Sequence, residues 1–275
     1  MKKLFAIIAL ISFSTSTFAL TDLKWWTEEY GPYNYRDAST KKIEGISIEL
    51  LEATHKELGV NKNRKNYKLA PWARGYKAAQ KSGKMNVIFS TTRTGEREPI
   101  FKWFGPVAPT KISLFGKAGV GSVGAGDIRN HKSAGIRGDI GILLLQSKDK
   151  AFKVPKNKIV ALAKIKAMFK NVAKGKTKFF AYEENVAKFS MPKNGFKLSD
   201  FEVAHTLQVN ELWYAVNKSV DDATVQAYQD ALDKVKGTSA VKAVLKKKFD
   251  VAPVTKANSL FANCGLTQAN QSCKK

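Results

Sequence analysis

Residues 71–98, PWARGYKAAQKSGKMNVIFSTTRTGERE, decide the fold class because a helix and a strand follow one another within them. Residues 72–81 are predicted to form a helix, and residues 85–90, which contain an apolar run at 87–89, are predicted to form a buried strand. A helix that leads into a buried strand is typical of α/β proteins. The polar turn after the strand carries Arg93 and Arg97, and a guanidinium in this place is a candidate to bind an anionic ligand.

The alternation of strands and helices continues on both sides of this stretch. Before it, strands are predicted at residues 23–27 and 67–70, with a helix at residues 45–60 between them. From Lys111 the pattern starts again, with strands at residues 111–117, 133–139 and 212–216 and helices at residues 140–149, 220–237 and 239–249. Asp221 or Asp222 is expected to cap the helix at 220–237. Two such halves, with a largely parallel sheet, predict a two-lobed molecule that binds its ligand between the lobes.

The N-terminus is typical of a signal for export. Lys2 and Lys3 precede an apolar core at residues 4–13, and the pattern Thr17-Phe18-Ala19 favours cleavage after Ala19. Residues 1–19 are therefore predicted to be a signal peptide, and the mature chain is expected to be exported. No later stretch approaches the roughly 18 uninterrupted apolar residues that a transmembrane helix needs.

The formal net charge of +24 favours anionic ligands or surfaces. The basic residues are dispersed, and no zinc-finger or RNP-like motif is present, so a solvated basic surface is favoured and no nucleic-acid partner is expected. His55, His131 and His205 do not have metal-ligand spacing, and neither a metal nor a cofactor is predicted. Cys264 and Cys273 are expected to form a disulfide, which would stabilise an exported chain by roughly 2–3 kcal/mol.

Two further patterns offer little for catalysis. The glycine-rich stretch at residues 119–126 is not followed by Gly-Lys-Ser/Thr, so a surface connection is favoured over a phosphate-binding loop. It also lacks the Gly-x-Ser-x-Gly spacing of a hydrolase. Glu183 and Glu184 are adjacent, and adjacent residues on a strand point to opposite faces, which disfavours an acid–base pair.

Six stretches, in their order and spacing, resemble the bacterial periplasmic solute-binding proteins of the amino-acid-binding family, which serve ABC-type importers. They are WWTEEYGPYNYRD, KKIEGISIELLEATHKELGV, PWARGYKAAQKSGKMNVIFSTTRTGERE, FKWFGPV, SAGIRGDIG and NKSVDDATVQAYQDALDKVKGTSAVKAVLKKKF. The resemblance extends over nearly the whole mature chain to about Phe249. It implies a monomeric, non-enzymatic receptor in the periplasm that captures a small polar solute, an amino acid or related carboxylate, and presents it to a membrane permease.

The resemblance also implies the architecture. Each of two lobes would have a central sheet flanked by helices, and a hinge between them would close the lobes on the ligand. Lobe 1 would comprise residues 20–110 and 214–275, and lobe 2 would comprise residues 111–213.

The same resemblance implies which residues bind the ligand. Arg97 in TGER matches the family's Thr-x-x-Arg motif and would hold the ligand carboxylate through two parallel hydrogen bonds. Thr92 and Ser90, which precede it, would offer backbone and hydroxyl groups to the same carboxylate. From lobe 2, Arg137 and Gly141 in IRGDIG resemble the family's loop at a helix N-terminus, where amides favour an anion.

Other candidates complete the expected site. Glu183 best matches the acidic residue that binds the ligand ammonium in the family. Tyr30, Tyr33 and Trp72 are candidates for the walls of the cleft, although core packing is the ordinary explanation for large aromatic residues. Arg74 would imply a second anionic group on the ligand if it faces the cleft.

Some positions depart from the family pattern. Ser90 stands where a glycine is usual, and Asn86 and Lys178 stand where the family often has aspartates. Arg93 is expected to be exposed or structurally paired charge, and ordinary surface charge is favoured. Two other functions stay open: an enzyme on the same fold, with a glutamate in the cleft as its acid or base, and a ligand-sensing partner of a membrane receptor.

Overall fold

The structure is a computed structural model that describes residues 17–146 and 153–255. Its α-helices are α1 (Thr17–Asp22), α2 (Ile46–Glu57), α3 (Trp72–Gln80), α4 (Ala125–Asn130), α5 (Ile140–Leu145), α6 (Ile165–Ala173), α7 (Glu184–Lys193), α8 (Asp222–Gly237) and α9 (Ser239–Phe249). Its strands are β1 (Lys24–Thr27), β2 (Tyr35–Arg36), β3 (Ile43–Glu44), β4 (Tyr67–Leu69), β5 (Asn86–Thr92), β6 (Phe101–Lys117), β7 (Ser133–Ile136), β8 (Ile159–Leu162), β9 (Phe179–Glu183) and β10 (Phe201–Asn217). Short 3-10 turns are η1 (Arg64–Asn66), η2 (Lys156–Lys158) and η3 (Leu198–Asp200).

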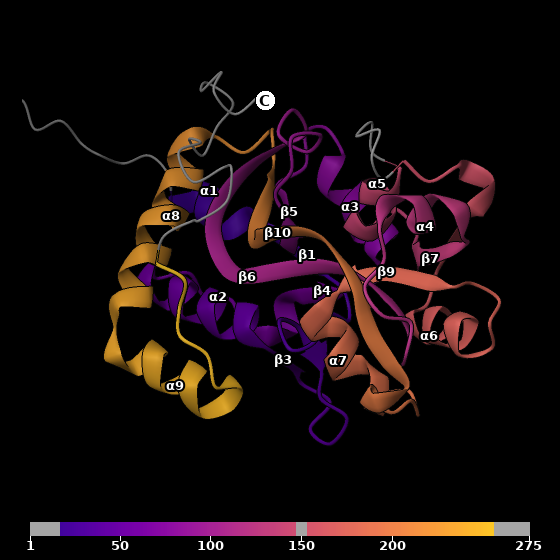
Figure 1. Cartoon of the computed structure of the whole chain (residues 1–275). Coiled ribbons are helices and arrows are strands. Elements are labelled where there is room, and N and C mark those ends of the chain that lie inside the picture. The colour runs from indigo at the N-terminus through magenta and orange to yellow at the C-terminus, as the bar shows by residue number, and fades with distance from the viewer. Residues whose placement is uncertain (1–16, 147–152, 256–275) are drawn as a thin grey trace, which may run out of the picture.

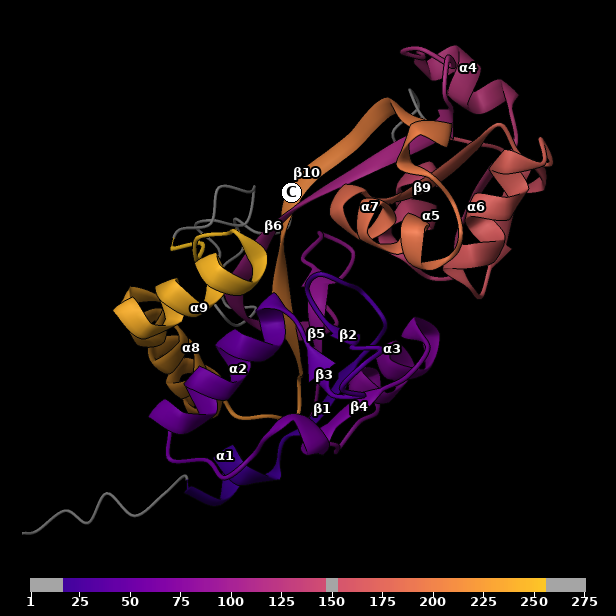
Figure 2. The same ribbon diagram turned by 90° about the horizontal axis from the view of Figure 1, so that it is seen from below.

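Eight strands form one sheet in the order β4-β1-β5-β10-β6-β9-β7-β8, and β2 pairs with β3 separately. The two ends of the sheet lie in different lobes (Figure 1). Lobe 1 holds β1, β4 and β5 with helices α2, α3, α8 and α9, and lobe 2 holds β7, β8 and β9 with helices α4 to α7 (Figure 2). The predicted two-lobed α/β fold is confirmed.

The strands β6 and β10 join the two lobes. Each has 17 residues, and they pair antiparallel from Phe101 opposite Asn217 to Lys117 opposite Phe201. At about 3.4 Å per residue each strand is roughly 55 Å long, enough to run through both lobes. The sequence predicted only parts of these strands. The predicted lobe boundaries fall inside β6 and β10, and their positions stay a prediction.

The expectation of a largely parallel sheet is wrong in the middle of the molecule. Strand β1 is parallel to β4 and β5, and β7 is parallel to β8 and β9, as alternation with helices predicts. Strand β10 is antiparallel to β5 and β6, and β6 is antiparallel to β9. The reason is that the chain leaves lobe 1 along β6 and returns along β10, so these strands must run in opposite directions.

Local signals for several elements are confirmed. Gly59 follows α2 with a φ of 67°, the left-handed conformation expected after a helix end. The Asp221 side chain caps α8 by accepting a hydrogen bond from the Thr224 backbone nitrogen (2.7 Å). Helices α2, α3, α8 and α9 and strands β1, β4 and β5 lie within or close to the residues predicted for them.

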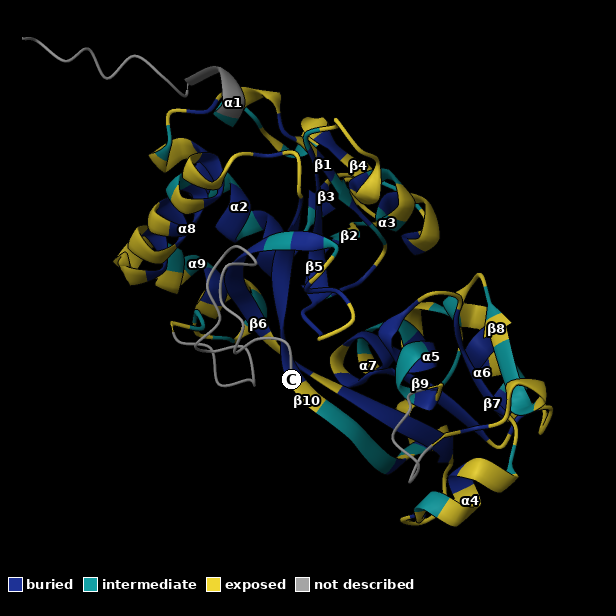
Figure 3. Cartoon of the chain, turned by 90° about the horizontal axis from the view of Figure 1, so that it is seen from above, coloured by how far each residue is buried: buried dark blue, intermediate teal, exposed yellow. Residues whose placement is uncertain are grey.

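Buried residues follow the strands and the helix sides that face them (Figure 3). In lobe 1, Phe104 of β6 stacks on Tyr214 of β10 with ring centroids 4.4 Å apart. In lobe 2, Phe115 of β6 stacks on Phe180 of β9 at 4.8 Å. Strand β6 therefore contributes aromatic rings to the packed cores of both lobes, and β10 contributes one to the core of lobe 1. These contacts attach the lobes to the two joining strands.

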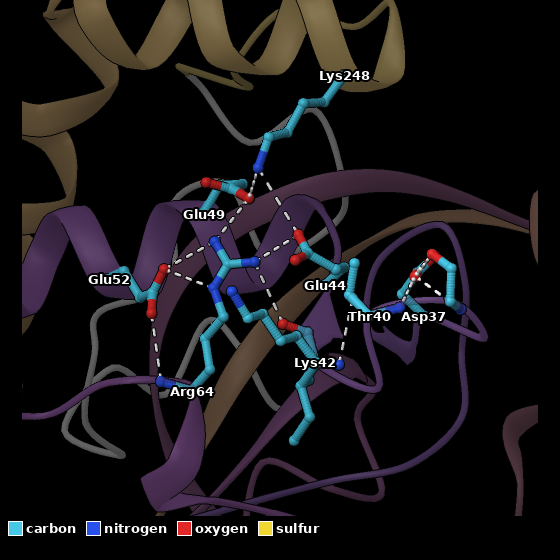
Figure 4. A network of polar contacts seen from close by, with 10 residues as sticks. Asp37, Thr40, Lys42, Glu44, Glu49, Glu52, Arg64 and Lys248 are labelled. Carbon is cyan, nitrogen blue, oxygen red and sulfur yellow. Dashed lines mark hydrogen bonds and ion pairs between the residues drawn. The ribbon is translucent and has the colours of Figure 1, made fainter.

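A network of charged groups attaches the last helix to lobe 1 (Figure 4). Arg64 of η1 pairs with Glu49 and Glu52 of α2, both at 2.8 Å, and with Glu44 of β3. Lys248 of α9 pairs with the same Glu49 (2.7 Å) and with Glu44 (3.6 Å). One arginine and one lysine thus bind three carboxylates from two elements, and such a network contributes more than isolated surface pairs do.

The glycine-rich stretch is a surface connection between β6 and α4, as predicted. Gly119 and Gly121 are exposed and have φ values of 83° and 67°. The Gly121 backbone nitrogen donates a hydrogen bond to the carboxylate of Glu202 at the start of β10. The turn therefore directs its amides at a carboxylate of the protein itself.

Some predictions fall on residues outside the described ranges. They are the disulfide between Cys264 and Cys273 and the predicted signal peptide up to residue 16. Over residues 17–146 and 153–255, none of the helices combines the length and apolar character that crossing a bilayer requires.

Candidate functional site

A cavity of about 370 Å³ lies between the two lobes, and we name it the interlobe cavity. Lobe 1 lines it with Glu28, Glu29 and residues 69–72, and lobe 2 lines it with Ile136, residues 163–165 and Tyr182. These residues lie at or just beyond the carboxyl ends of β1, β4, β7, β8 and β9. Ligands of α/β proteins bind at this end of parallel strands, so the interlobe cavity is the candidate ligand site.

Arg97 is buried beside the interlobe cavity, with 1% of its surface exposed. Its Nη1 donates to the Thr92 backbone oxygen (2.8 Å), and its guanidinium carbon lies 5.3 Å from the ring centroids of both Trp72 and Tyr76. Its Nε and Nη2 have no hydrogen-bond partner among the described residues. These two groups share one edge of the guanidinium, and that edge matches the two oxygens of a carboxylate.

Thr92 and Ser90 hold the neighbourhood of Arg97 in place. Thr92 ends β5, and its backbone oxygen fixes one nitrogen of Arg97. Ser90 has a φ of 57°, in the left-handed region that favours the glycine usual at this position. The Ser90 hydroxyl bonds to Ser47 Oγ (2.7 Å) and to Asn34 Oδ1. The hydroxyl therefore joins β5 to α2 and to the loop before β2.

Trp72 is a wall of the interlobe cavity and a contact between the lobes. It begins α3, and its Nε1 donates to the backbone oxygen of Gly138 in lobe 2 (2.9 Å). Its ring stacks on Tyr76 with centroids 5.2 Å apart. Because Arg97 lies against the rings of Trp72 and Tyr76, Trp72 both positions the guanidinium and covers it.

Tyr30 and Tyr33 join the lobes on another side of the site. The Tyr30 ring packs on Tyr33 (5.8 Å between centroids) and on Tyr182 of β9 (5.7 Å). The Tyr33 hydroxyl lies 3.2 Å from Glu183 Oε1 and accepts a hydrogen bond from Asn185 Nδ2 (2.9 Å). Both tyrosines are buried, so they are packed interlobe contacts.

Glu183 is fully buried and caps helix α7. Its Oε2 accepts from the Val186 backbone nitrogen (2.7 Å), while its Oε1 faces the Tyr33 hydroxyl. Burial raises the pKa of Glu183 to about 7, although these hydrogen bonds act in the opposite direction. The residue therefore changes its charge near neutral pH, and its expected role in binding a ligand ammonium stays a prediction.

The raised pKa of Glu183 predicts how a substitution changes the pH dependence of stability. The folded state holds the proton up to about pH 7, whereas the unfolded chain releases it near 4.5, so this group's contribution falls as the pH rises between these values. Glu183→Gln removes this dependence. Its free energy of unfolding, relative to the wild type, is expected to rise by about 2–3 kcal/mol from pH 4.5 to pH 7.5 in urea titrations.

Glu184→Gln is the matched control, because it changes the neighbouring glutamate. Burial raises the pKa of Glu184, but the hydrogen bond from Ser113 (2.7 Å) and the pairing with Lys111 (3.1 Å) outweigh burial and lower it. The stability of Glu184→Gln relative to the wild type should therefore fall, not rise, as the pH increases. Parallel pH curves for the two variants would contradict the assignment.

The loop between β7 and α5 contains two predicted residues in different settings. Arg137 is exposed, and Gly141 is buried where a Cβ atom would lie 2.5 Å from the backbone oxygen of Ala181. Gly141 therefore lets α5 approach β9 closely. Burial raises the pKa of Asp139, whereas Arg97 and the amides of Gly141 and its neighbour lower it. Asp139 is the N-cap residue of α5, and its side chain forms no capping hydrogen bond with the helix.

Sequence reasoning missed two carboxyl groups at the site, Glu28 and Asp139. Glu28 lines the interlobe cavity, and burial together with the nearby Asp139 raises its pKa well above the usual value, while Arg97 opposes this rise. Glu28 follows β1 and Asp139 follows β7, so the rule that ligands bind beyond the carboxyl ends of strands was the available signal. Glu28 is therefore a carboxyl group whose ionised form a nearby cation would favour.

Arg74 and Arg93, the remaining arginines considered in the sequence, do not line the interlobe cavity. Arg74 is exposed on α3, and its side chain forms no hydrogen bond or ion pair within the described ranges. The prediction that Arg93 is surface charge is wrong, because only 1% of it is exposed. It pairs with Glu98 through two bonds of 2.7 and 2.9 Å and lies between the rings of Trp103 and Trp213. Those rings come from β6 and β10, 10 and 120 residues after Arg93.

Residues 25–251 match the model of a family described as bacterial extracellular solute-binding proteins, family 3. Comparison with curated proteins finds no match. Solved structures with the same fold include an ABC uptake transporter substrate binding protein from Streptococcus pneumoniae with bound histidine. It has a TM-score of 0.72 and 14% identity, and the match covers 87% of this chain and 97% of that chain.

Two further similar structures are a binding protein and a sensor domain. The arginine-, lysine-, histidine-binding protein ArtJ of Geobacillus stearothermophilus has a TM-score of 0.66 and 18% identity, with 84% of this chain and 96% of that chain covered. A histidine kinase sensor domain with similarity to periplasmic binding proteins has a TM-score of 0.69 and 17% identity, with 84% and 98% covered. At these identities the likeness shows the fold alone.

Proposed function

Because the chain belongs to the bacterial extracellular solute-binding proteins, family 3, we propose that it captures a free amino acid or related carboxylate between its lobes for an ABC-type importer. The observation that carries this proposal is the edge of Arg97. Two buried N–H groups, Nε and Nη2, have no acceptor among the described residues, and the guanidinium lies against Trp72, which lines a cavity of about 370 Å³. A ligand carboxylate would accept from both groups and remove the cost of burying them.

The acidic side of the interlobe cavity supports an amino acid with a basic side chain. Glu28 and Asp139 have raised pKa values, and a ligand cation between them would favour their ionised forms. The rings of Trp72 and Tyr182 line the same cavity, and aromatic faces attract cations. A similar structure named for arginine, lysine and histidine binding, and another with bound histidine, agree with this choice of ligand.

Lobe closure would place the ligand between both sets of contacts. We propose that residues 20–110 and 214–275 move as lobe 1 and residues 111–213 as lobe 2, about a hinge in β6 and β10. Trp72 and Tyr33 already contact lobe 2 through Gly138 and Asn185, so these contacts would hold the closed form. The mature chain would act as a monomer in the periplasm after removal of residues 1–19.

Thermal unfolding of residues 20–275 with matched ligands tests the proposal. We expect L-arginine, L-lysine or L-histidine to stabilise the protein, by about 2.7 kcal/mol at 100 times the dissociation constant. Agmatine, which is arginine without its carboxylate, should stabilise far less because Arg97 then has no acceptor. Citrulline, which keeps the carboxylate but has an uncharged side chain, should also bind more weakly because Glu28 and Asp139 lose their cation.

The result distinguishes the other functions. If no compound with a carboxylate raises the melting temperature, the receptor proposal is wrong. Conversion of a bound compound into a product would favour an enzyme on this fold. The likeness to a histidine kinase sensor domain supports a sensing partner as the second candidate, and ligand-dependent binding to a membrane receptor, without import, would favour it.

A further inference from the structure

An open pocket of about 550 Å³ lies in lobe 2, beyond the end of β6 and before the starts of β7 and β9. The pocket and the interlobe cavity lie at opposite ends of the strands of lobe 2. Lys132 and Lys178, which line it, precede the amino ends of β7 and β9, whereas Ile136 and Tyr182 of the interlobe cavity lie near the carboxyl ends of these strands. The two pockets are therefore separate sites.

The charge of this pocket is strongly positive. Four of its residues are lysines, Lys117, Lys132, Lys176 and Lys178, and all four are exposed. In the part of the chain that the structure describes, none of these four forms an ion pair. The nearby carboxylate of Glu202 is bound by amides of the glycine-rich turn, which lower its pKa. Four like charges around one hollow attract a multivalent anion.

One residue of the pocket lining carries a buried hydroxyl group without a partner. Thr177 lines the pocket, and only 2% of the residue is exposed. Its Oγ1 has no hydrogen-bond partner among residues 17–146 and 153–255. Buried hydroxyl groups are ordinarily paired, because an unpaired one costs free energy. An oxyanion in the pocket would accept a hydrogen bond from Thr177 while the lysines neutralise its charge.

We propose that this pocket is a second ligand site, which binds a phosphate group carried on a larger molecule. Phosphate is favoured over a carboxylate because it offers up to two charges and several acceptor oxygens to the four lysines and the hydroxyl. The volume exceeds that of a phosphate group, and Val120 and Val172 supply apolar wall for the rest of the ligand. The phosphate belongs either to a dissolved phosphorylated compound or to a lipid headgroup.

Calorimetric titration of the full mature protein with inorganic pyrophosphate at low salt tests the pocket. We expect saturable binding of one pyrophosphate that Lys132→Gln/Lys176→Gln weakens by at least about tenfold, because charged hydrogen bonds are lost. The matched control is Lys77→Gln/Lys81→Gln, which removes two exposed charges from lobe 1 and should change binding by less than about twofold. Arg97→Ala should retain the binding, which separates this pocket from the interlobe cavity.

Thr177→Val tests the buried hydroxyl directly. The substitution keeps the shape of the side chain and removes a donor without a partner, so the ligand-free melting temperature should stay equal or rise. Pyrophosphate affinity should fall by about three- to tenfold. Unchanged affinity in this variant, absence of saturable binding, or an equal loss in the two lysine double variants would overturn the proposal.

Vesicles distinguish the two sources of the phosphate. Phosphatidylcholine vesicles with about 30% phosphatidylglycerol carry phosphate groups on an anionic surface. The pocket would be assigned to lipid headgroups if the wild type bound these vesicles, Lys132→Gln/Lys176→Gln did not, and Lys77→Gln/Lys81→Gln still did. Pyrophosphate binding without vesicle binding would assign it to a dissolved phosphorylated compound.

Discussion

Arg97→Ala is expected to weaken binding of the amino acid by at least about 100-fold, because it removes two hydrogen bonds to a carboxylate in a buried place. The geometry is specific to this residue. Nη1 is held by the Thr92 backbone oxygen, which leaves the edge with Nε and Nη2 for the ligand. Isothermal titration with the compound that gives the largest thermal shift measures the loss.

Two variants make the Arg97 result interpretable. Arg97→Lys keeps the charge but loses the planar edge, so it should recover only part of the affinity. Arg74→Ala removes an exposed arginine from α3 and should leave affinity almost unchanged. If Arg97→Ala bound the amino acid within about threefold of the wild type, Arg97 would be a structural residue and the carboxylate would bind elsewhere.

Glu98→Ala is expected to lower the free energy of unfolding by about 3–5 kcal/mol, because it leaves the buried guanidinium of Arg93 without its carboxylate. The pair has two bonds of 2.7 and 2.9 Å, and the Arg93 guanidinium carbon lies 4.8 Å from the Trp213 ring and 5.4 Å from the Trp103 ring. Water has little access to this position. Urea titration of the ligand-free protein measures the effect.

Removing both charges should cost less than removing one. Arg93→Met/Glu98→Leu replaces the pair by apolar groups of similar size, so its loss should be smaller than that of Glu98→Ala. The exposed pair of Lys234 and Glu57 provides the comparison, and Glu57→Ala should cost no more than about 1 kcal/mol. A loss from Glu98→Ala as small as this would mean that the Arg93 pair is solvated.

The sequence predicted those parts of the molecule that local patterns determine. Periodicity and capping residues located α2, α3, α8 and α9, because a helix shows its buried face within a few turns. The arginine motif singled out Arg97, and the structure brings it together with Trp72 and Thr92. The length of β6 and β10 escaped prediction, since each strand passes through two cores and shows no single pattern along its 17 residues.

The errors at the site have a common physical cause. Arg93 was expected to be surface charge because its neighbours in sequence are polar, but Trp103 of β6 and Trp213 of β10 cover it. Asp139 lies close enough to Glu28 to raise its pKa only because β1 and β7 end at the same cavity. Burial by distant elements cannot be deduced from adjacent residues, and it decides which charges face a ligand.

The path of the chain through β6 and β10 has a consequence for biogenesis. Strand β5 takes its second neighbour from β10, through residues 212–216, whereas β6 to β9 are contiguous in sequence and are made earlier. As the polypeptide is made, N-terminus first, the sheet of lobe 1 keeps an unpaired edge at β5 until β10 has been made. The order of synthesis therefore lets β6 to β9 of lobe 2 form before the sheet of lobe 1 is complete, and an unpaired β5 is the surface that a holding chaperone would need to shield.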